Sequence, residues 1–138
     1  EGTVLVVDDE ELVRHFARET LEGFGFDVLL AAGGMEGVRL FREHADDLAC
    51  VLLDLRMPEM DGAEVFRELH RLRPEIPVLL CSGFADEEST NELATQGLAG
   101  FLQKPYTIAA LRRMLQAVLA EAAAEAEAKA DAEADDEA

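Results

Sequence analysis

Residues 50–62, CVLLDLRMPEMDG, place a carboxylate at the end of an apolar run. The apolar residues 50–53 are typical of a strand that is buried on both faces, and Asp54 follows them directly. Pro58 and Gly62 then mark a turn into the next element. Because a carboxylate beside a buried strand costs free energy unless it has a partner or a chemical role, Asp54 is a candidate functional residue.

Short apolar segments rich in Val and Leu recur along the chain and predict five strands. They are TVLVV at 3–7, FDVLLA at 26–31, ACVLLD at 49–54, IPVLLCS at 76–82 and GFLQK at 100–104. Between and after them, apolar residues recur at helical spacing: Leu12, Phe16 and Leu21; Val38 and Phe41; Val65, Phe66 and Leu69; Leu93; and Ile108, Leu111, Leu115 and Val118. This alternation predicts an α/β fold, in which a parallel sheet is covered by helices on both sides.

Helix boundary signals agree with this division of the chain. Gly23 and Gly25 are suited to end the first helix. Asp61, with Glu64 three residues later, forms a capping-box pattern that opens the third helix, and Thr107 is suited to cap the fifth.

The length and the charge of the chain exclude several classes of function. The 138 residues and 15.1 kDa fit one domain and leave no room for a second, catalytic one. The net charge of -18 repels nucleic acid and anionic lipid, so we expect neither to bind directly. Since no apolar run reaches roughly 20 residues and the N-terminus lacks a signal-peptide layout, a cytoplasmic protein, or the cytosolic part of a membrane-anchored one, is expected.

The cysteines and histidines do not form a recognisable metal or redox motif. Cys50 and Cys81 lie in apolar segments without zinc-site spacing, which indicates buried, reduced thiols. His15, His44 and His70 fall on separate predicted helices, away from the strand ends. We interpret them as solvated or structural histidines.

From residue 120 the composition changes to AEAAAEAEAKADAEADDEA, with eight acidic residues and one lysine. Subtracting the net -7 of this tail from -18 leaves -11, so acidity is not confined to it. Ala and Glu favour helix, and Glu125 with Lys129 is a favourable pair, so the last helix should continue past residue 119. Without an apolar stripe it should fray in DAEADDEA, and we interpret the tail as a linker or solvated extension.

Polar side chains stand where the predicted strands end, which is the edge at which doubly wound sheets bind ligands. These residues are Asp8, Asp9, Asp54, Ser82 and Lys104. If the first and third strands are neighbours, three carboxylates converge, and their repulsion favours a hard divalent cation. The expected ion is Mg²⁺, with Mn²⁺ as a substitute.

A magnesium ion with few protein ligands keeps positions that phosphate oxygens fill, so the pattern points to phosphoryl chemistry. Lys104, the one lysine before the tail, supplies a compact positive charge, and Ser82 supplies a hydroxyl donor. Each residue alone has an ordinary structural explanation; their joint placement at strand ends favours the functional one.

Four segments carry a resemblance to a known family: VLVVDDE at 4–10, LLDLRMPEMDG at 52–62, LLCSG at 79–83 and FLQKPY at 101–106. Together they resemble the receiver domain of bacterial two-component response regulators, including the C-terminal receivers of hybrid histidine kinases. The resemblance covers residues 3 to about 119 and implies a doubly wound, flavodoxin-like (βα)5 sandwich with a parallel sheet of order 2-1-3-4-5. Residues 1–119 would be the receiver domain and 120–138 the acidic extension.

The resemblance assigns roles residue by residue. Asp54 matches the phosphoacceptor, whose carboxylate forms an acyl phosphate. Asp8 and Asp9 match the acidic pair that binds Mg²⁺, together with the Asp54 side chain and the backbone carbonyl of Arg56. Lys104 matches the lysine that binds the phosphoryl group.

Other family positions concern switching and phosphate lifetime. Ser82 and Phe101 match the switch hydroxyl and aromatic, which couple the site to a face made by the fourth helix, the strand 100–104 and the fifth helix. The Lys104–Pro105 peptide bond is typically cis in this family. Arg56 and Phe84 occupy positions that influence water access, and we hypothesise that both slow hydrolysis of the acyl phosphate.

The implied phosphoryl donor is a histidine of a sensor histidine kinase or a phosphotransfer domain, and a homodimer through the switch face is a further expectation. The domain would phosphorylate and dephosphorylate itself without being an enzyme in the ordinary sense; kinase activity would require a larger hybrid kinase. Two alternatives stay open: a pseudo-receiver that binds partners without phosphorylation, and a haloacid-dehalogenase-like phosphatase. So do three architectures, a stand-alone receiver, a truncated regulator and a receiver from a hybrid kinase.

Overall fold

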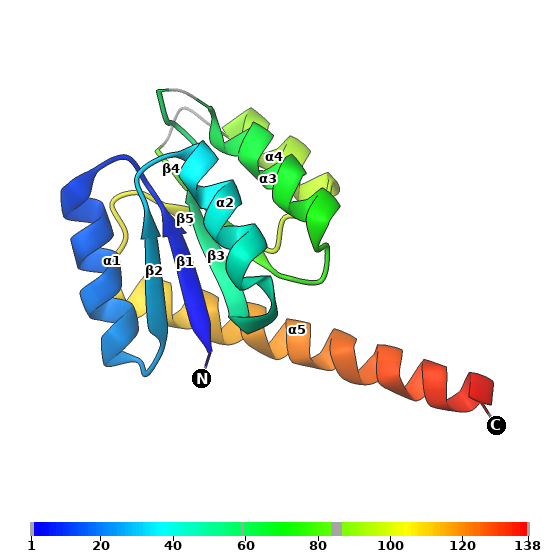
Figure 1. Ribbon diagram of the computed structural model, residues 1–138. Coiled ribbons are helices and arrows are strands. Elements are labelled where there is room, and N and C mark those ends of the chain that lie inside the picture. Colours follow the sequence, from blue (N-terminus) through cyan, green and yellow to red (C-terminus); the bar gives the residue numbers. More distant parts are fainter. Residues whose placement is uncertain (1, 59, 84–86, 138) are drawn as a thin grey trace.

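The computed structural model describes residues 2–58, 60–83 and 87–137, and strands and helices alternate along the chain (Figure 1). The strands are β1 Thr3–Val7, β2 Asp27–Ala31, β3 Leu48–Asp54, β4 Val78–Ser82 and β5 Gly100–Gln103. The helices are α1 Glu11–Gly23, α2 Gly34–His44, the 3-10 turn η1 Ala45–Asp47, α3 Gly62–Leu72, α4 Glu87–Thr95 and α5 Ile108–Glu137.

The strands form one parallel sheet in the order β2-β1-β3-β4-β5, so the expected doubly wound flavodoxin-like topology is confirmed. Each predicted strand is present, with its ends shifted by at most two residues. β1 and β3 are neighbours, and the register pairs Val7 with Leu53. The carboxyl ends of these two strands therefore lie side by side.

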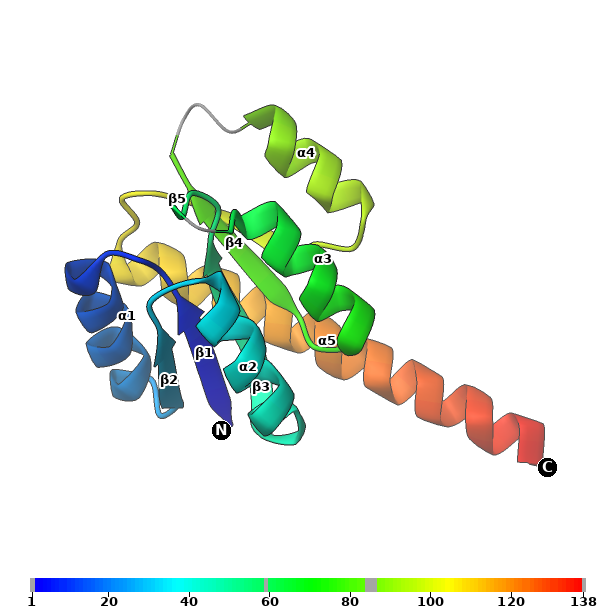
Figure 2. The same ribbon diagram turned by 45° about the horizontal axis from the view of Figure 1, so that its top comes forward.

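Alternate residues of the strands face two separate cores, one on each side of the sheet. Leu5 and Val7 of β1 belong to the core beneath α2, α3 and α4, whereas Val4 and Val6 belong to the core beneath α1 and α5. Figure 2 shows the two sets of helices on opposite sides of the sheet. The near-continuous apolar strands follow from this burial on both faces.

Two predicted helix caps are present as hydrogen bonds. The backbone N–H of Glu64 donates to Asp61 Oδ1 at 2.9 Å, and that of Ala110 donates to Thr107 Oγ1 at 3.0 Å. After α1, Gly25 takes a φ of +99°, which a residue with a side chain rarely adopts. These features fix where α1 ends and where α3 and α5 begin.

Three of the apolar residues at helical spacing are exposed. Leu12 is 84% exposed, Phe16 39% and Ile108 52%, while Ala17 and Leu21 are the buried apolar residues of α1. Of the residues whose spacing predicts the first helix, only Leu21 is buried in the core. Position in a helical pattern does not by itself give the rotation of the helix about its axis, which the packing of Ala17 against the sheet determines here.

α5 extends well beyond the sheet (Figure 1) and continues to Glu137, through the segment in which composition predicts fraying. Its buried side chains end at Val118, and from 123 to 132 every residue is exposed. The strong helix propensity of Ala and Glu, rather than packing, accounts for this part of the helix. None of the described helices has the length and hydropathy of a membrane span.

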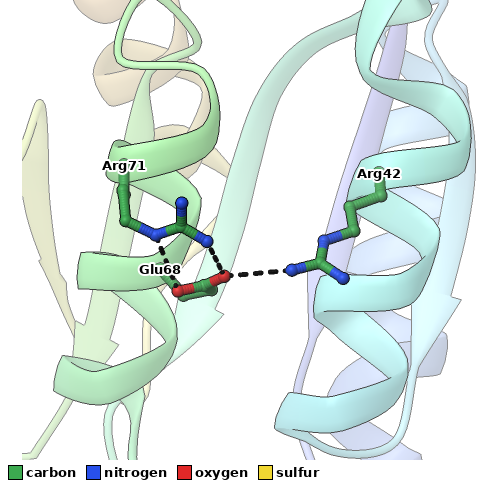
Figure 3. Close-up of polar contacts among 3 residues, drawn as sticks. All are labelled: Arg42, Glu68 and Arg71. Atoms are coloured by element: carbon green, nitrogen blue, oxygen red, sulfur yellow. Dashed lines mark hydrogen bonds and ion pairs between the residues drawn. The ribbon is translucent and has the colours of Figure 1, made fainter.

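An ion-pair cluster joins α2 to α3 on the outer surface (Figure 3). Glu68 accepts from Arg71 Nη2 at 2.6 Å and from Arg42 Nη2 at 3.1 Å, and hydrogen bonding to Arg71 lowers the pKa of Glu68. Because both arginines are exposed, these ion pairs contribute little to the stability of the fold.

Candidate functional site

Four polar residues lie at the carboxyl edge of the sheet, where the strands β1, β3, β4 and β5 end. Asp8 follows β1, Asp54 ends β3, Ser82 ends β4 and Lys104 follows β5. Asp8, Asp54 and Ser82 are only 3%, 4% and 1% exposed, although all three are polar. Buried polar groups at a strand edge need partners, and their partners define the site.

Lys104 joins the acidic residues of this edge. Its Nζ lies 2.8 Å from Asp8 Oδ2 and 3.2 Å from Asp54 Oδ1, with Glu10 Oε1 at 3.7 Å. One ammonium thus neutralises part of the charge of three carboxylates. The Lys104–Pro105 peptide bond that follows is cis.

The pKa of Asp54 is raised from 3.8 to about 6, first by burial and then by the charge of Asp8, against the opposing effect of Lys104. Burial acts to lower the pKa of Lys104, but its hydrogen bond to Asp8 and the charges of Asp54 and Asp8 raise it above its usual value. Lys104 is therefore cationic throughout the neutral range, and Asp54 is a carboxylate whose charge is incompletely compensated.

The position of Asp54 is determined by close backbone packing. The N–H of Leu55 donates to the Cys81 carbonyl at 3.0 Å, and the N–H of Gly62 donates to the Leu55 carbonyl at 2.7 Å. A Cβ on Gly62 would collide with the Asp54 carbonyl oxygen and lie 2.6 Å from Leu55 Cα. Only glycine allows α3 to begin this near the end of β3.

The buried Oγ of Ser82 has no hydrogen-bond partner among the residues that the structure describes. Its backbone carbonyl accepts from the N–H of Lys104 at 2.8 Å, which holds the end of β4 beside the lysine. A hydroxyl that is buried and unpaired is costly, and such a group is available to a ligand oxygen.

The acidic edge fits a hard cation. Among the described residues, the ligand atoms of Asp8, Asp9 and Glu10 all lie within 4.8 Å of one another. Oxygen donors at this spacing are what Mg²⁺ prefers. Asp54 is outside this group of three and pairs with Lys104 instead. Glu10 is a member that the sequence reasoning missed, although its place directly after the acidic pair could have suggested it.

The remaining predicted residues lie around this centre. Phe101 is half-buried and packs against the core beneath α2, α3 and α4. Arg56 is exposed and, with Asp9 and Asp61, lines a cavity of about 470 Å³. Phe84 lies outside the described residues.

Neither cysteine contributes its side chain to the site. Cys50 and Cys81 are free and buried, as expected, and burial raises the pKa of Cys50 to about 12. His15, His44 and His70 lie on α1, α2 and α3, and His70 stacks on Phe66 at 5.5 Å.

A second cavity of about 490 Å³, which the sequence did not indicate, adjoins Lys104. It lies between α1 and the segment after β5, and its lining is mostly apolar: Glu10, Leu12, Val13, Phe16, Lys104, Pro105 and Tyr106. The exposed Leu12 therefore lines a groove beside the polar site and is not part of the core.

Comparison with known proteins identifies similar chains. The family model described as "Response regulator receiver domain" matches residues 4–116. The sensor kinase CckA of Brucella abortus is 34% identical over 86% of this chain and 12% of its own length. The transcriptional regulatory protein ZraR of Salmonella typhimurium is 36% identical over 85% of this chain and 26% of its own length. This chain therefore spans only a small part of these relatives.

Solved structures give the same result for the fold. A response regulator receiver domain protein from Clostridium thermocellum superposes with a TM-score of 0.84 at 27% identity, covering 88% of this chain and 96% of that one. The chemotaxis protein CheY4 of Vibrio cholerae gives 0.79 at 28% identity, covering 85% and 98%.

Proposed function

Since the chain belongs to the response regulator receiver domain family, we propose that Asp54 accepts a phosphoryl group from a phosphohistidine of a sensor kinase or phosphotransfer domain. The observation that carries this assignment is the position of Lys104 Nζ between Asp8 Oδ2 and Asp54 Oδ1. A cation that is already beside the acceptor can neutralise the incoming phosphoryl oxygens without a large rearrangement.

In the proposed step, an Asp54 carboxylate oxygen attacks phosphorus, the bond to the histidine nitrogen breaks, and its electron pair stays on the imidazole. The raised pKa of Asp54 still leaves it largely ionised at neutral pH, as a nucleophile must be. Lys104 moves its charge from Asp54 toward the phosphoryl group, and the buried Ser82 hydroxyl donates to a phosphoryl oxygen.

The residues that would hold Mg²⁺ are Asp8, Asp9, the Asp54 side chain and the backbone carbonyl of Arg56, with Glu10 close to the first two. When bound, the ion supplies positive charge to the phosphoryl oxygens. The protein's own contribution is to hold these oxygens at one edge of a rigid sheet.

The phosphodonor protein would dock over the apolar cavity that Leu12, Phe16 and Tyr106 line. This cavity is continuous with the site, since Glu10 and Lys104 line its polar end. An exposed apolar groove beside a polar centre fits a helix that carries the donor histidine on its surface.

The output would be carried by the face of α4, β5 and α5. Movement of Ser82 toward the phosphoryl group frees space that the half-buried Phe101 ring can enter, which couples the site to this face. A homodimer through the same face is the proposed assembly. Arg56, exposed at the rim of the cavity beside Asp9, would screen the acyl phosphate from water together with Phe84.

The decisive experiment is incubation with Mg²⁺ and acetyl phosphate, followed by intact-mass measurement. The wild type should gain one phosphoryl group and Asp54→Asn should gain none. Asp61→Asn is the matched control, because it removes an exposed carboxylate near the site while Asn still caps α3. A wild type that stays unmodified, or an Asp54→Asn variant that gains the group, would contradict the assignment.

A further inference from the structure

Each polar atom of Asp8 has a partner. Its N–H donates to the Ala31 carbonyl at 3.1 Å, and its Oδ1 accepts from the Glu10 N–H at 2.9 Å. Its Oδ2 lies 2.8 Å from Lys104 Nζ. The fourth atom, the backbone carbonyl oxygen, accepts from Arg14 Nη1 at 2.8 Å. The first three contacts belong to the sheet and to the site described above, and only the fourth comes from a side chain on the body of α1.

The carbonyl needs this donor because the strand pairing ends just before it. The ladder between β1 and β2 closes with Val7 opposite Ala31, so the Asp8 carbonyl lies beyond the last paired residues. Asp8 is buried, and a buried carbonyl without a donor is destabilising. Arg14, half-buried on α1, supplies a charged donor at that point.

The bond holds one particular peptide plane. The carbonyl of Asp8 belongs to the peptide that joins it to Asp9, so the bond from Arg14 limits rotation of the backbone between the two carboxylates. Asp9 is exposed and lies beyond Val7, the last residue of β1 that is paired with β2 and β3. The direction of its side chain therefore depends on the orientation of this peptide.

We infer that Arg14 is a positioning residue for the magnesium pair: it fixes the Asp8–Asp9 peptide so that both carboxylates face the same point. This inference rests on the proposed function, since it assumes that the pair binds Mg²⁺. Arg14 touches neither the phosphoryl group nor the ion and acts only through the backbone of Asp8. In metal sites generally, mutation of a group that orients a ligand lowers metal affinity by about 10- to 100-fold.

If only the charge of Arg14 mattered, its removal would have the opposite effect on the affinity for Mg²⁺, and this difference can be tested. Arg14 places a positive charge close to an acidic site, so its removal should strengthen binding of a cation if charge is all that matters. If the orientation of the peptide matters more, its removal should weaken binding. The sign of the change in the Mg²⁺ dissociation constant separates the two explanations.

The experiment is a Mg²⁺ titration of the full chain, followed by the backbone ¹H–¹⁵N signals of residues 8–10, for the wild type, Arg14→Gln, Arg14→Lys and Arg18→Gln. Arg18 is the matched control, because it is a half-buried arginine about one turn further along the same helix. We expect Arg14→Gln to raise the dissociation constant by roughly tenfold. Arg14→Lys should recover much of the affinity, since an ammonium can also donate to the carbonyl, and Arg18→Gln should match the wild type or bind slightly more tightly.

A second readout separates positioning from general destabilisation. The rate of phosphorylation by acetyl phosphate in Arg14→Gln should recover to the wild-type rate at saturating Mg²⁺, which a damaged fold would not allow. An unchanged or lower dissociation constant in Arg14→Gln, with normal Mg²⁺ binding by the wild type, would overturn the role of Arg14 alone. Absence of Mg²⁺-dependent shifts in the wild type would overturn the metal assignment and this inference with it.

Discussion

Lys104 Nζ lies nearer to Asp8 Oδ2, at 2.8 Å, than to Asp54 Oδ1, at 3.2 Å. The lysine is thus nearer to Asp8 than to the proposed acceptor, Asp54, and the two carboxylates share it. This sharing agrees with the raised pKa of Asp54, which burial and the charge of Asp8 produce despite the lysine. Asp8, Asp54 and Lys104 together carry one negative charge in excess until a cation or a proton binds.

Replacement of Lys104 should destabilise the fold at neutral pH. In Lys104→Met the buried carboxylates of Asp8 and Asp54 face each other without a cation, and we expect a loss of about 2 to 3 kcal/mol at pH 7. The raised pKa of Lys104 keeps its stabilising charge in place at all pH values below its ordinary pKa. The loss should shrink near pH 5, where Asp54 takes up a proton.

Urea unfolding at pH 5 and pH 7 in the presence of EDTA would measure this loss. Lys129→Met is the control, because it removes the tail's one lysine, which is exposed. An equal loss at both pH values would show that the ammonium stabilises the site by packing and not by its charge.

Ionisation of Asp54 should lower the free energy of unfolding as the pH rises. The pKa of Asp54 is about 6 in the fold, against 3.8 for an unperturbed Asp, so between these values the folded state holds a proton that the unfolded state has released. Stability from this group is complete below about pH 4 and decreases as the pH rises through 6. We expect Asp54→Asn to be more stable than the wild type by about 1 to 2 kcal/mol at pH 7, after allowance for solvent screening.

Thermal unfolding from pH 3.5 to 7.5 without divalent cations would test this. The two proteins should have similar stability at the acidic end and diverge above pH 4. Parallel curves would mean that ionisation of Asp54 carries no penalty in the folded state.

Replacement of Gly62 should displace Asp54, the proposed acceptor. A Cβ at this position would collide with the Asp54 carbonyl oxygen and approach Leu55 Cα, both of which are backbone atoms. Gly62→Ala should therefore cost about 2 to 3 kcal/mol and slow phosphorylation by displacing Asp54. Gly23→Ala, where no atom lies within 4 Å of an added Cβ, should leave stability unchanged or slightly raised. If both variants unfold at the wild-type urea concentration, the close approach has no energetic consequence.

The strand ends were predictable and the helix surfaces were not. The alternating pattern gives the strands, and parallel strands must gather Asp8, Asp54 and Lys104 at one edge. The exposure of Leu12 depends on how α1 is rotated about its axis, and the bond from Arg14 depends on where pairing with β2 stops. Both are properties of packing between elements, which no local pattern contains.

The acidic tail should be dispensable for folding of the receiver domain. From 123 to 132 all side chains are exposed, and the buried apolar residues of α5 end at Val118. A chain that ends at Ala122 should therefore keep the wild-type unfolding temperature within about 2 °C and the same phosphorylation rate. A chain that ends at Leu115 is the control, because it removes the buried Val118 and should unfold at lower temperature. A large loss on removal of residues 123–138 would make the tail part of the domain.

Leu12 should matter for a protein donor and not for a small one. It is 84% exposed and lines the apolar cavity beside Lys104, so Leu12→Ser removes docking surface without opening the core. We expect transfer from a protein donor that carries a phosphohistidine to slow by about tenfold. Phosphorylation by phosphoramidate, which has a phosphorus–nitrogen bond but no surface to dock, should keep its wild-type rate. Met35→Ser is the control, since Met35 is 72% exposed on α2 and does not line this cavity. Equal slowing with both donors would place the effect of Leu12 in the site, and unchanged transfer from the protein donor would remove the cavity from the donor interface.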